Sequence, residues 1–190
     1  TQIKLKDKAK EQAQKAVDLS IKMNDTAAIG RSYGTLAVIL YEDSSFTESI
    51  KMFKKALPFL VHTGSLNFIH IAYTDIASAY FANSDYNDAD IYIDSSIVLA
   101  KQLGKSINLA GSYLVKARVL TYLKKYSEAE KIFALAWDNI QKDGSNLDYK
   151  MYYNNLGELH FAQGKYKEAY EDIYNMVLYN AKVVNEDTQD

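Results

Sequence analysis

Apolar side chains recur along this chain at the three- and four-residue steps of an α-helix. In one stretch they are Tyr126, Ala129, Phe133, Ala136, Trp137 and Ile140. The stretch before it has the same helical spacing at Leu109, Tyr113, Ala117 and Leu120. A short polar break separates the two stretches. The pattern therefore predicts a pair of helices, each with one apolar face.

The paired pattern repeats with a period of forty residues. Two sets of aromatic positions show the period: Tyr33, Tyr73, Tyr113 and Tyr153, and then Phe46, Tyr86, Tyr126 and Tyr166. Each period closes on a small residue at a matching place: Asn24, Gly64, Gly104 and Gly144. Gly and Asn adopt a positive φ at low cost, so we expect these residues to be the left-handed stops of helices.

The periods divide the chain into four predicted helix pairs, at 26–65, 66–105, 106–145 and 146–183. A half repeat at 1–25 precedes them, and a tail at 184–190 follows. Because the chain opens on Thr1 and in mid-repeat, we expect it to be a fragment of a longer protein. The single proline, Pro58, is predicted to kink or shorten its helix.

The predicted last helix has apolar residues around much of its circumference. They are Tyr170, Ile173, Tyr174, Met176, Val177, Leu178, Tyr179 and Val183. A terminal helix of a repeat array normally shows a polar outer face to water. We therefore expect either a further helix or a second copy of the chain to cover this helix. In the second case the chain forms a homodimer through 166–183.

The four copies resemble tetratricopeptide (TPR) repeats. In that family the first helix has an aromatic residue, a Leu-small pair and then Leu or an aromatic, and the second has an aromatic, Ala, aromatic, Ala series. The matching residues here are Tyr33, Leu36, Ala37, Leu40, Phe46, Ser49, Phe53, Ala56; Tyr73, Ile76, Ala77, Tyr80, Tyr86, Ala89, Ile93, Ser96; Tyr113, Lys116, Ala117, Leu120, Tyr126, Ala129, Phe133, Ala136; and Tyr153, Leu156, Gly157, His160, Tyr166, Ala169, Ile173, Met176. The departures are Lys116, His160 and Met176, a missing proline at the repeat end, and a period of forty instead of the usual ~34.

The resemblance implies an all-α fold, a right-handed superhelical TPR solenoid of antiparallel helix pairs in a single domain over 1–190. Small residues are expected where the second helix of a pair approaches the first: Ala37, Ala77, Ala117 and Gly157. Since no single pair buries its apolar face alone, stacked pairs are expected to share the core. In this family the concave wall made by the first helices usually holds the ligand, often an extended peptide or a helix.

Candidate ligand-binding residues lie on the concave face of the first helices. They are Arg31, Val38, Tyr41; Ile71, Thr74, Ser78, Phe81; Leu114, Arg118, Thr121; and Met151, Asn154, Glu158, Phe161. Arg31 and Arg118 are expected to receive a carboxylate, because Arg binds that group with two parallel hydrogen bonds. Tyr41, Phe81 and Phe161 recur at one level, where they either anchor a ligand or pack against the neighbouring helix pair.

One binding device of the family is absent. The TPR modules that grip the C-terminal carboxylate of chaperones carry Lys and Asn along their concave helices. The matching places here hold Gly34, Val38, Asp75, Gly111 and Val115. The sequence therefore argues against a chaperone adaptor of that type.

Composition and charge narrow the class of function. The 22 basic and 24 acidic residues nearly cancel, and the stretch 70–100 has five acids and no Lys or Arg, so we expect no nucleic-acid partner through this segment. The chain has no cysteine, and its three histidines lack ligand spacing, so neither a metal site nor a cofactor is predicted. The longest apolar run, 36–41, is far below the ~20 residues that span a bilayer, so no membrane insertion is expected.

The sequence thus predicts a non-catalytic module that binds a protein or peptide. Its long repeats and its uncovered last helix resemble the TPR sensory segments of bacterial signalling and transcription regulators, which sit before a membrane helix, a coiled coil and an output domain. That setting implies the cytoplasmic or the periplasmic side of a membrane-associated regulator. The alternative is a free-standing scaffold or adaptor with no output domain.

Overall fold

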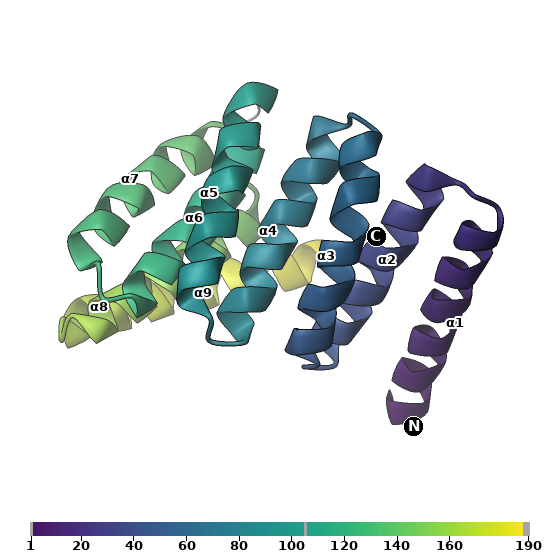
Figure 1. Ribbon diagram of the computed structural model, residues 1–190. Coiled ribbons are helices and arrows are strands. Elements are labelled where there is room, and N and C mark those ends of the chain that lie inside the picture. The colour runs from purple at the N-terminus through teal and green to yellow at the C-terminus, as the bar shows by residue number, and fades with distance from the viewer. Residues whose placement is uncertain (1, 105, 188–190) are drawn as a thin grey trace. The chain divides into compact units, whose positions relative to one another are not determined.

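The computed structural model describes residues 2–104 and 106–187, with side chains from 6 to 104 and from 109 to 186. Within these ranges every regular element is an α-helix, labelled α1 to α9 in Figure 1, so the predicted all-α class is confirmed. The chain divides into two compact units, 1–99 and 100–190, each with a core of its own. A single domain over 1–190 stays a prediction.

Unit 1 is built from α1 to α4 and most of α5, in which each helix packs on its neighbour in sequence. The helices are α1 (Gln2–Lys22), α2 (Thr26–Glu42), α3 (Phe46–His62), α4 (Leu66–Ala82) and α5 (Tyr86–Leu103). Its core includes a cluster from three helices: Ala37, Ile50, Phe53, Ile76 and Ala79. A second cluster joins α1 to α2: Ala13, Val17, Leu36 and Leu40. Since α2 contributes to both clusters, each helix pair depends on the next for burial.

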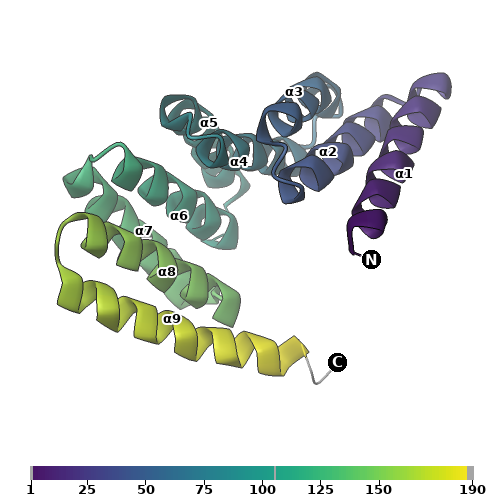
Figure 2. The ribbon, with the colours of Figure 1, turned by 90° about the horizontal axis from the view of Figure 1, so that it is seen from below.

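Unit 2 contains two helix pairs, and α8 and α9 lie antiparallel and side by side in it (Figure 2). Its helices are α6 (Ser106–Tyr122), α7 (Tyr126–Asp143), α8 (Asn146–Ala162) and α9 (Tyr166–Asp187). Phe133, Ile140 and Leu159 are almost completely buried. Trp137 of α7 meets Tyr152 of α8 at 4.9 Å between ring centroids, so aromatic stacking adds to the apolar contact between the pairs.

The helix bounds follow the forty-residue period closely. Pro58 does not shorten its helix, because α3 runs through it and has 17 residues like α2 and α4. The proline is exposed, so its ring lies on the solvent side of α3. At the other end, α9 continues to Asp187, beyond the predicted end at 183, so part of the expected tail is helical. The remaining tail residues, 188–190, lie outside the described residues.

The left-handed turns agree with the prediction at three places and differ at a fourth. Asn24, Gly64 and Gly104 have φ of 51°, 69° and 66°. Gly144 has φ −74°, so the expectation of a left-handed stop was wrong there. A Cβ at Gly144 would lie 2.5 Å from the carbonyl oxygen of Ile140, so close approach is the reason for this glycine.

A second series of left-handed residues was not predicted. It lies at the turn inside each helix pair: Ser44, Ser84, Lys124 and Gly164, with φ from 59° to 76°. Three of the four are not glycine, so glycine spacing could not reveal this series. The described chain therefore turns back on itself about every twenty residues.

Small residues lie where the helices of a pair approach each other, as expected. Ala37, Ala77 and Ala117 have no exposed surface. A Cβ at Gly157 would lie 3.2 Å from the Cδ1 atom of Ile173 in α9. The packing of α8 on α9 is therefore close at 157, and a larger residue there would have to displace the Ile173 side chain.

Candidate functional site

An open groove of about 660 Å³ lies in unit 2, where the ends of α6 and α8 meet the beginnings of α7 and α9. We call it the unit 2 groove. It is lined by Thr121, Tyr122, Lys124, Tyr126, Gly157, Glu158, Phe161, Ala162, Tyr166, Ala169, Tyr170 and Ile173. Most of these side chains are apolar or aromatic, so the groove offers large nonpolar surfaces to whatever enters it.

Three aromatic rings of the groove are unusually exposed. Phe161 is 67%, Tyr166 66% and Tyr170 73% exposed. Phe161 and Tyr166 contact each other edge to face, with 5.5 Å between their centroids. Adjacent rings left open to solvent in a hollow are typical of a surface that another molecule covers.

The ring pair at the mouth of the groove recurs in unit 1. Tyr41 meets Phe46 at 5.5 Å and Phe81 meets Tyr86 at 5.4 Å, at the same five-residue spacing. Each of the three predicted anchor rings thus packs on the second helix of its own pair. The two predicted arrangements were a ligand anchor and packing against the neighbouring helix pair, and this contact within a pair is neither. Tyr41 and Phe161 still expose part of their rings to solvent.

The third pair has Thr121 in place of the first ring. Thr121 is buried, and its hydroxyl donates to the carbonyl oxygen of Ala117 at 2.9 Å. Its small side chain leaves the space beside Tyr126 free, and this space is part of the groove. The break in the aromatic series therefore helps to open the groove.

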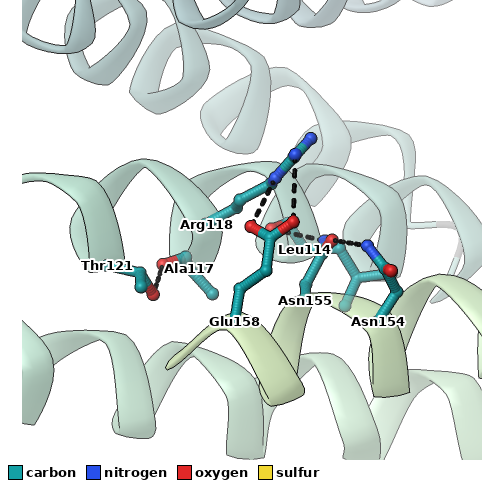
Figure 3. A network of polar contacts seen from close by, with 7 residues as sticks. All are labelled: Leu114, Ala117, Arg118, Thr121, Asn154, Asn155 and Glu158. Carbon is teal, nitrogen blue, oxygen red and sulfur yellow. Dashed lines mark hydrogen bonds and ion pairs between the residues drawn. The ribbon is translucent and has the colours of Figure 1, made fainter. Parts of the chain in front are cut away.

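Arg118 already holds a carboxylate. Its guanidinium donates from Nε to Oε2 of Glu158 at 3.0 Å and from an NH2 group to Oε1 at 3.1 Å, which joins α6 to α8 (Figure 3). Glu158 thus accepts from two of the five N–H groups of Arg118, and the expectation that Arg118 receives a ligand carboxylate stays a prediction. The pair joins the two first helices of unit 2, and its Glu158 lines the groove.

Next to this pair, Asn155 links the same two helices. Its side-chain amide donates to the carbonyl oxygen of Leu114 at 3.5 Å and accepts a hydrogen bond from Asn154 at 3.4 Å (Figure 3). Leu114 has no exposed surface, which removes it from the set of ligand-contacting candidates. Asn154 is only partly buried and stays in that set.

An ionisable pair lies behind the groove, between α8 and α9. His160 Nδ1 and Asp172 Oδ2 are 2.6 Å apart. Burial raises the pKa of Asp172, and the hydrogen bond from His160 opposes that rise. The corresponding positions in the first pair are the apolar Leu40 and Met52, so the fourth pair replaces an apolar contact with a polar one.

A smaller hollow of about 340 Å³ lies in unit 1, between α2, α3 and α4. We call it the unit 1 hollow. Val38, Tyr41, Glu42, Phe53, Asp75 and Ser78 line it. Burial raises the pKa of the Asp75 carboxyl to about 6.

The other candidates of unit 1 are spread over the surface. Arg31 and Ile71 are exposed. The Thr74 hydroxyl donates to the carbonyl oxygen of His70 at 3.1 Å, and it lies 2.7 Å from the Ser96 hydroxyl, so it is engaged within the fold. The predicted residues thus gather in two places, Val38, Tyr41 and Ser78 in the hollow, and Thr121, Glu158 and Phe161 in the groove.

Sequence reasoning missed site residues of two kinds: some lie on turns and second helices, and others lie on first helices at positions outside the predicted concave face. In the groove they include Tyr122, Lys124 and Tyr166. Tyr170 and Ile173 could have been found, because the sequence already shows them among the apolar residues that surround the last helix. In the hollow the missed residues are Glu42, Phe53 and Asp75.

Within the described residues, no cluster of three or more His, Cys, Asp or Glu side chains is arranged to hold a metal ion. No helix in that part of the chain is long and apolar enough to cross a membrane.

Comparison with known proteins finds one matching family profile and several similar folds. Residues 151–187 match the family profile described as Tetratricopeptide repeat. No curated protein sequence matches the chain. Among solved structures, BtubC (BKLC) from P. vanneervenii superposes with a TM-score of 0.75 at 17% identity, over 93% of this chain and 74% of that one.

Two further structures contain the nearly identical TPR-like repeats of a putative kinesin light chain from Podosopora anserina. They give TM-scores of 0.75 and 0.73 at 17% and 18% identity. The superpositions cover 97% and 96% of this chain and 91% and 90% of those chains. At these low sequence identities, the structural similarity shows only that the chains share a fold.

The fold and the open groove define a helical-repeat protein of the kind that serves as a protein-interaction module. The tetratricopeptide repeat profile falls on residues 151–187, within the pair α8 and α9 that forms one wall of the groove.

Proposed function

We propose that this chain is a non-catalytic module that binds a partner protein by receiving an apolar helical or peptide segment in the unit 2 groove. The observation that carries the proposal is the cluster of Phe161, Tyr166 and Tyr170, each about two-thirds or more exposed around one hollow. Covering these rings removes apolar surface from water, which supplies the driving force for binding.

The repeat register supports a helix as the bound segment. One position of the repeat falls in each of the four second helices, at Phe53, Ile93, Phe133 and Ile173. The first three are at most 3% exposed, but Ile173 is 41% exposed. In unit 1, Ile76 and Ala79 of α4 pack with Phe53 in one cluster. A partner helix with similar residues would meet Ile173 in the same way.

Selection of random peptides displayed on phage against the full chain tests the proposal. We expect the enriched peptides to carry apolar residues at helical spacing, and to lose binding about tenfold or more with Phe161→Ser or Tyr170→Ser, the size of effect expected of aromatic anchors. Leu135→Ser is the matched control, because Leu135 is exposed on α7 outside the groove.

Two results would contradict the proposed site. One is a set of enriched peptides that bind the Phe161→Ser and Tyr170→Ser variants as tightly as the parent chain. The other is an equal loss with Leu135→Ser, which would place the binding surface elsewhere on unit 2.

For the wider setting we propose the sensory or interaction region of a larger bacterial signalling or transcription-regulatory protein. Support comes from the forty-residue repeats and the open α9, which resemble such segments. The alternative is a free-standing assembly scaffold or adaptor. The full-length sequence separates the two, since a membrane helix or an output domain in the same polypeptide favours the first and a chain of repeats alone favours the second.

A further inference from the structure

The acid Asp75 lies in the unit 1 hollow without a base beside it. Burial raises the pKa of its carboxyl to about 6. Within the described part of the chain, no Lys, Arg or His forms an ion pair or hydrogen bond with it. A partly buried carboxylate of this kind is stabilised by any cation that reaches it.

The walls of the hollow are matched to a cation on an apolar stem. Val38 provides most of the apolar surface, since Phe53 is only 3% exposed, and Tyr41 contributes a partly exposed aromatic ring. Glu42 adds a second carboxylate from α2 to that of Asp75 on α4. Methylene groups pack on apolar walls, and a cationic head group is attracted by a carboxylate and by the face of a tyrosine ring.

The Ser78 hydroxyl leaves an acceptor free in the same hollow. It donates its own hydrogen to the carbonyl oxygen of Thr74 at 2.9 Å. Its oxygen keeps lone pairs that can accept a hydrogen bond from an incoming donor. An incoming ammonium or guanidinium group has donors for both the hydroxyl and the carboxylates.

We propose that the unit 1 hollow binds the side chain of a lysine or arginine from a partner protein. The head group lies between Asp75 and Glu42, and the stem lies against Val38 and Phe53. The residues of this site differ from those of the proposed unit 2 groove. The hollow selects a partner with a cationic side chain, whereas the groove selects apolar side chains.

A bare metal ion fits this hollow less well than a side chain. Calcium takes six to eight oxygen ligands, and the side chains of the hollow offer two carboxylates and two hydroxyls, those of Ser78 and Tyr41. The other wall residues, Val38 and Phe53, have no side-chain oxygen. The chemistry therefore favours an organic cation.

NMR titration of the isotope-labelled full chain tests the proposal with four defined compounds. These are the N-acetyl methylamides of arginine and lysine and their neutral counterparts, citrulline and Nε-acetyllysine. We expect saturable shifts of the amides of residues lining the hollow with the two cations. Binding of the neutral compounds should be at least about tenfold weaker, because hydrogen bonds between charged groups are the strong ones.

Variants of the chain complete the test. Asp75→Asn keeps the shape of the hollow and should weaken binding of the arginine compound about tenfold, and Glu42→Gln should weaken it less. Glu11→Gln on α1 is the matched control and should change nothing, because Glu11 is exposed and pairs with Lys15. Removing a buried charge does not threaten the fold, so a loss with Asp75→Asn reports on binding.

The proposal is overturned if the neutral compounds bind as tightly as the cations, if Asp75→Asn leaves the affinity unchanged, or if no compound gives a saturable shift at the hollow. None of these results bears on the peptide selection that tests the unit 2 groove. Each proposal can therefore be refuted while the other stands.

Discussion

At the scale of single residues, Asp75 is a largely buried acid, and no base among the described residues pairs with it. The pKa of its carboxyl is about 6 in the folded protein, against 3.8 as the ordinary value. Between these values the folded state binds more protons than the unfolded state, so the free energy of unfolding decreases as the pH rises. A shift of about two pKa units corresponds to roughly 3 kcal/mol of lost stability at neutral pH.

Replacing this acid with its amide should stabilise the chain at neutral pH. We expect Asp75→Asn to raise the free energy of unfolding by about 1–3 kcal/mol at pH 7.5 and to have little effect at pH 4, where Asp75 is protonated in the folded state. Urea denaturation followed by helical circular dichroism at both pH values measures the difference.

Asp138→Asn is the control for this comparison, because Asp138 is an exposed acid on α7. Its effect should be small and similar at the two pH values. If Asp75→Asn gave the same gain at pH 4 as at pH 7.5, ionisation of Asp75 would not be the source of the cost.

At the scale of the elements, the turn inside each helix pair forces one residue into the left-handed region. Lys124 has φ 60° and Gly164 has φ 76° at matching places in unit 2. In this region a Cβ crowds the neighbouring backbone, so a residue other than glycine is less stable there. The first of these turns is therefore strained, and the second is relaxed.

Exchanging the residue type at these turns should move stability in opposite directions. We expect Lys124→Gly to raise the free energy of unfolding by about 0.5–1 kcal/mol and Gly164→Ala to lower it by about 1 kcal/mol. Space does not limit either change, since nothing lies within 4 Å of a Cβ built at Gly164. Chemical denaturation of the two variants measures both values.

Gly144→Ala provides a contrast, because its backbone φ is −74° and suits any residue. A loss of stability there would come from the 2.5 Å approach of the new Cβ to the carbonyl oxygen of Ile140. A loss with Lys124→Gly would refute the assignment of steric strain to that turn.

At the scale of the whole molecule, α9 presents an apolar face that no described helix covers. Tyr174, Val177 and Leu178 are exposed on it, beyond the end of the unit 2 groove. Large exposed apolar surfaces of this kind favour association with another protein surface. A second copy of the chain, paired through 166–183, is one such surface.

We therefore expect the chain to self-associate as its concentration rises. Val177→Lys should weaken that association, because it places a charge in the apolar face, while peptide binding in the groove is kept, since Val177 does not line it. Sedimentation equilibrium over a wide concentration range measures the association. Leu135→Lys on α7 is the matched control, and a chain that stays monomeric at the highest concentration would contradict the expectation.

Much of the fold could be predicted from the sequence, because helix periodicity and turn residues act over short distances along the chain. The register of Tyr33, Tyr73, Tyr113 and Tyr153 was enough to place the pairs. The site was predicted only in part. Thr121, Glu158 and Phe161 were among the candidates, but Tyr166 was read only as a family marker of the second helix, although it lines the groove.

What the sequence determined by itself is the all-α class, the forty-residue pairing of helices and most of the helix ends, since each of these follows from residues within a few turns of one another. Only the tertiary structure decided that Arg118 pairs with Glu158, that Asp172 meets His160 and that Asp75 is buried without a base. These facts depend on side chains brought together from different helices. The burial that sets their chemistry exists only after the helices have packed.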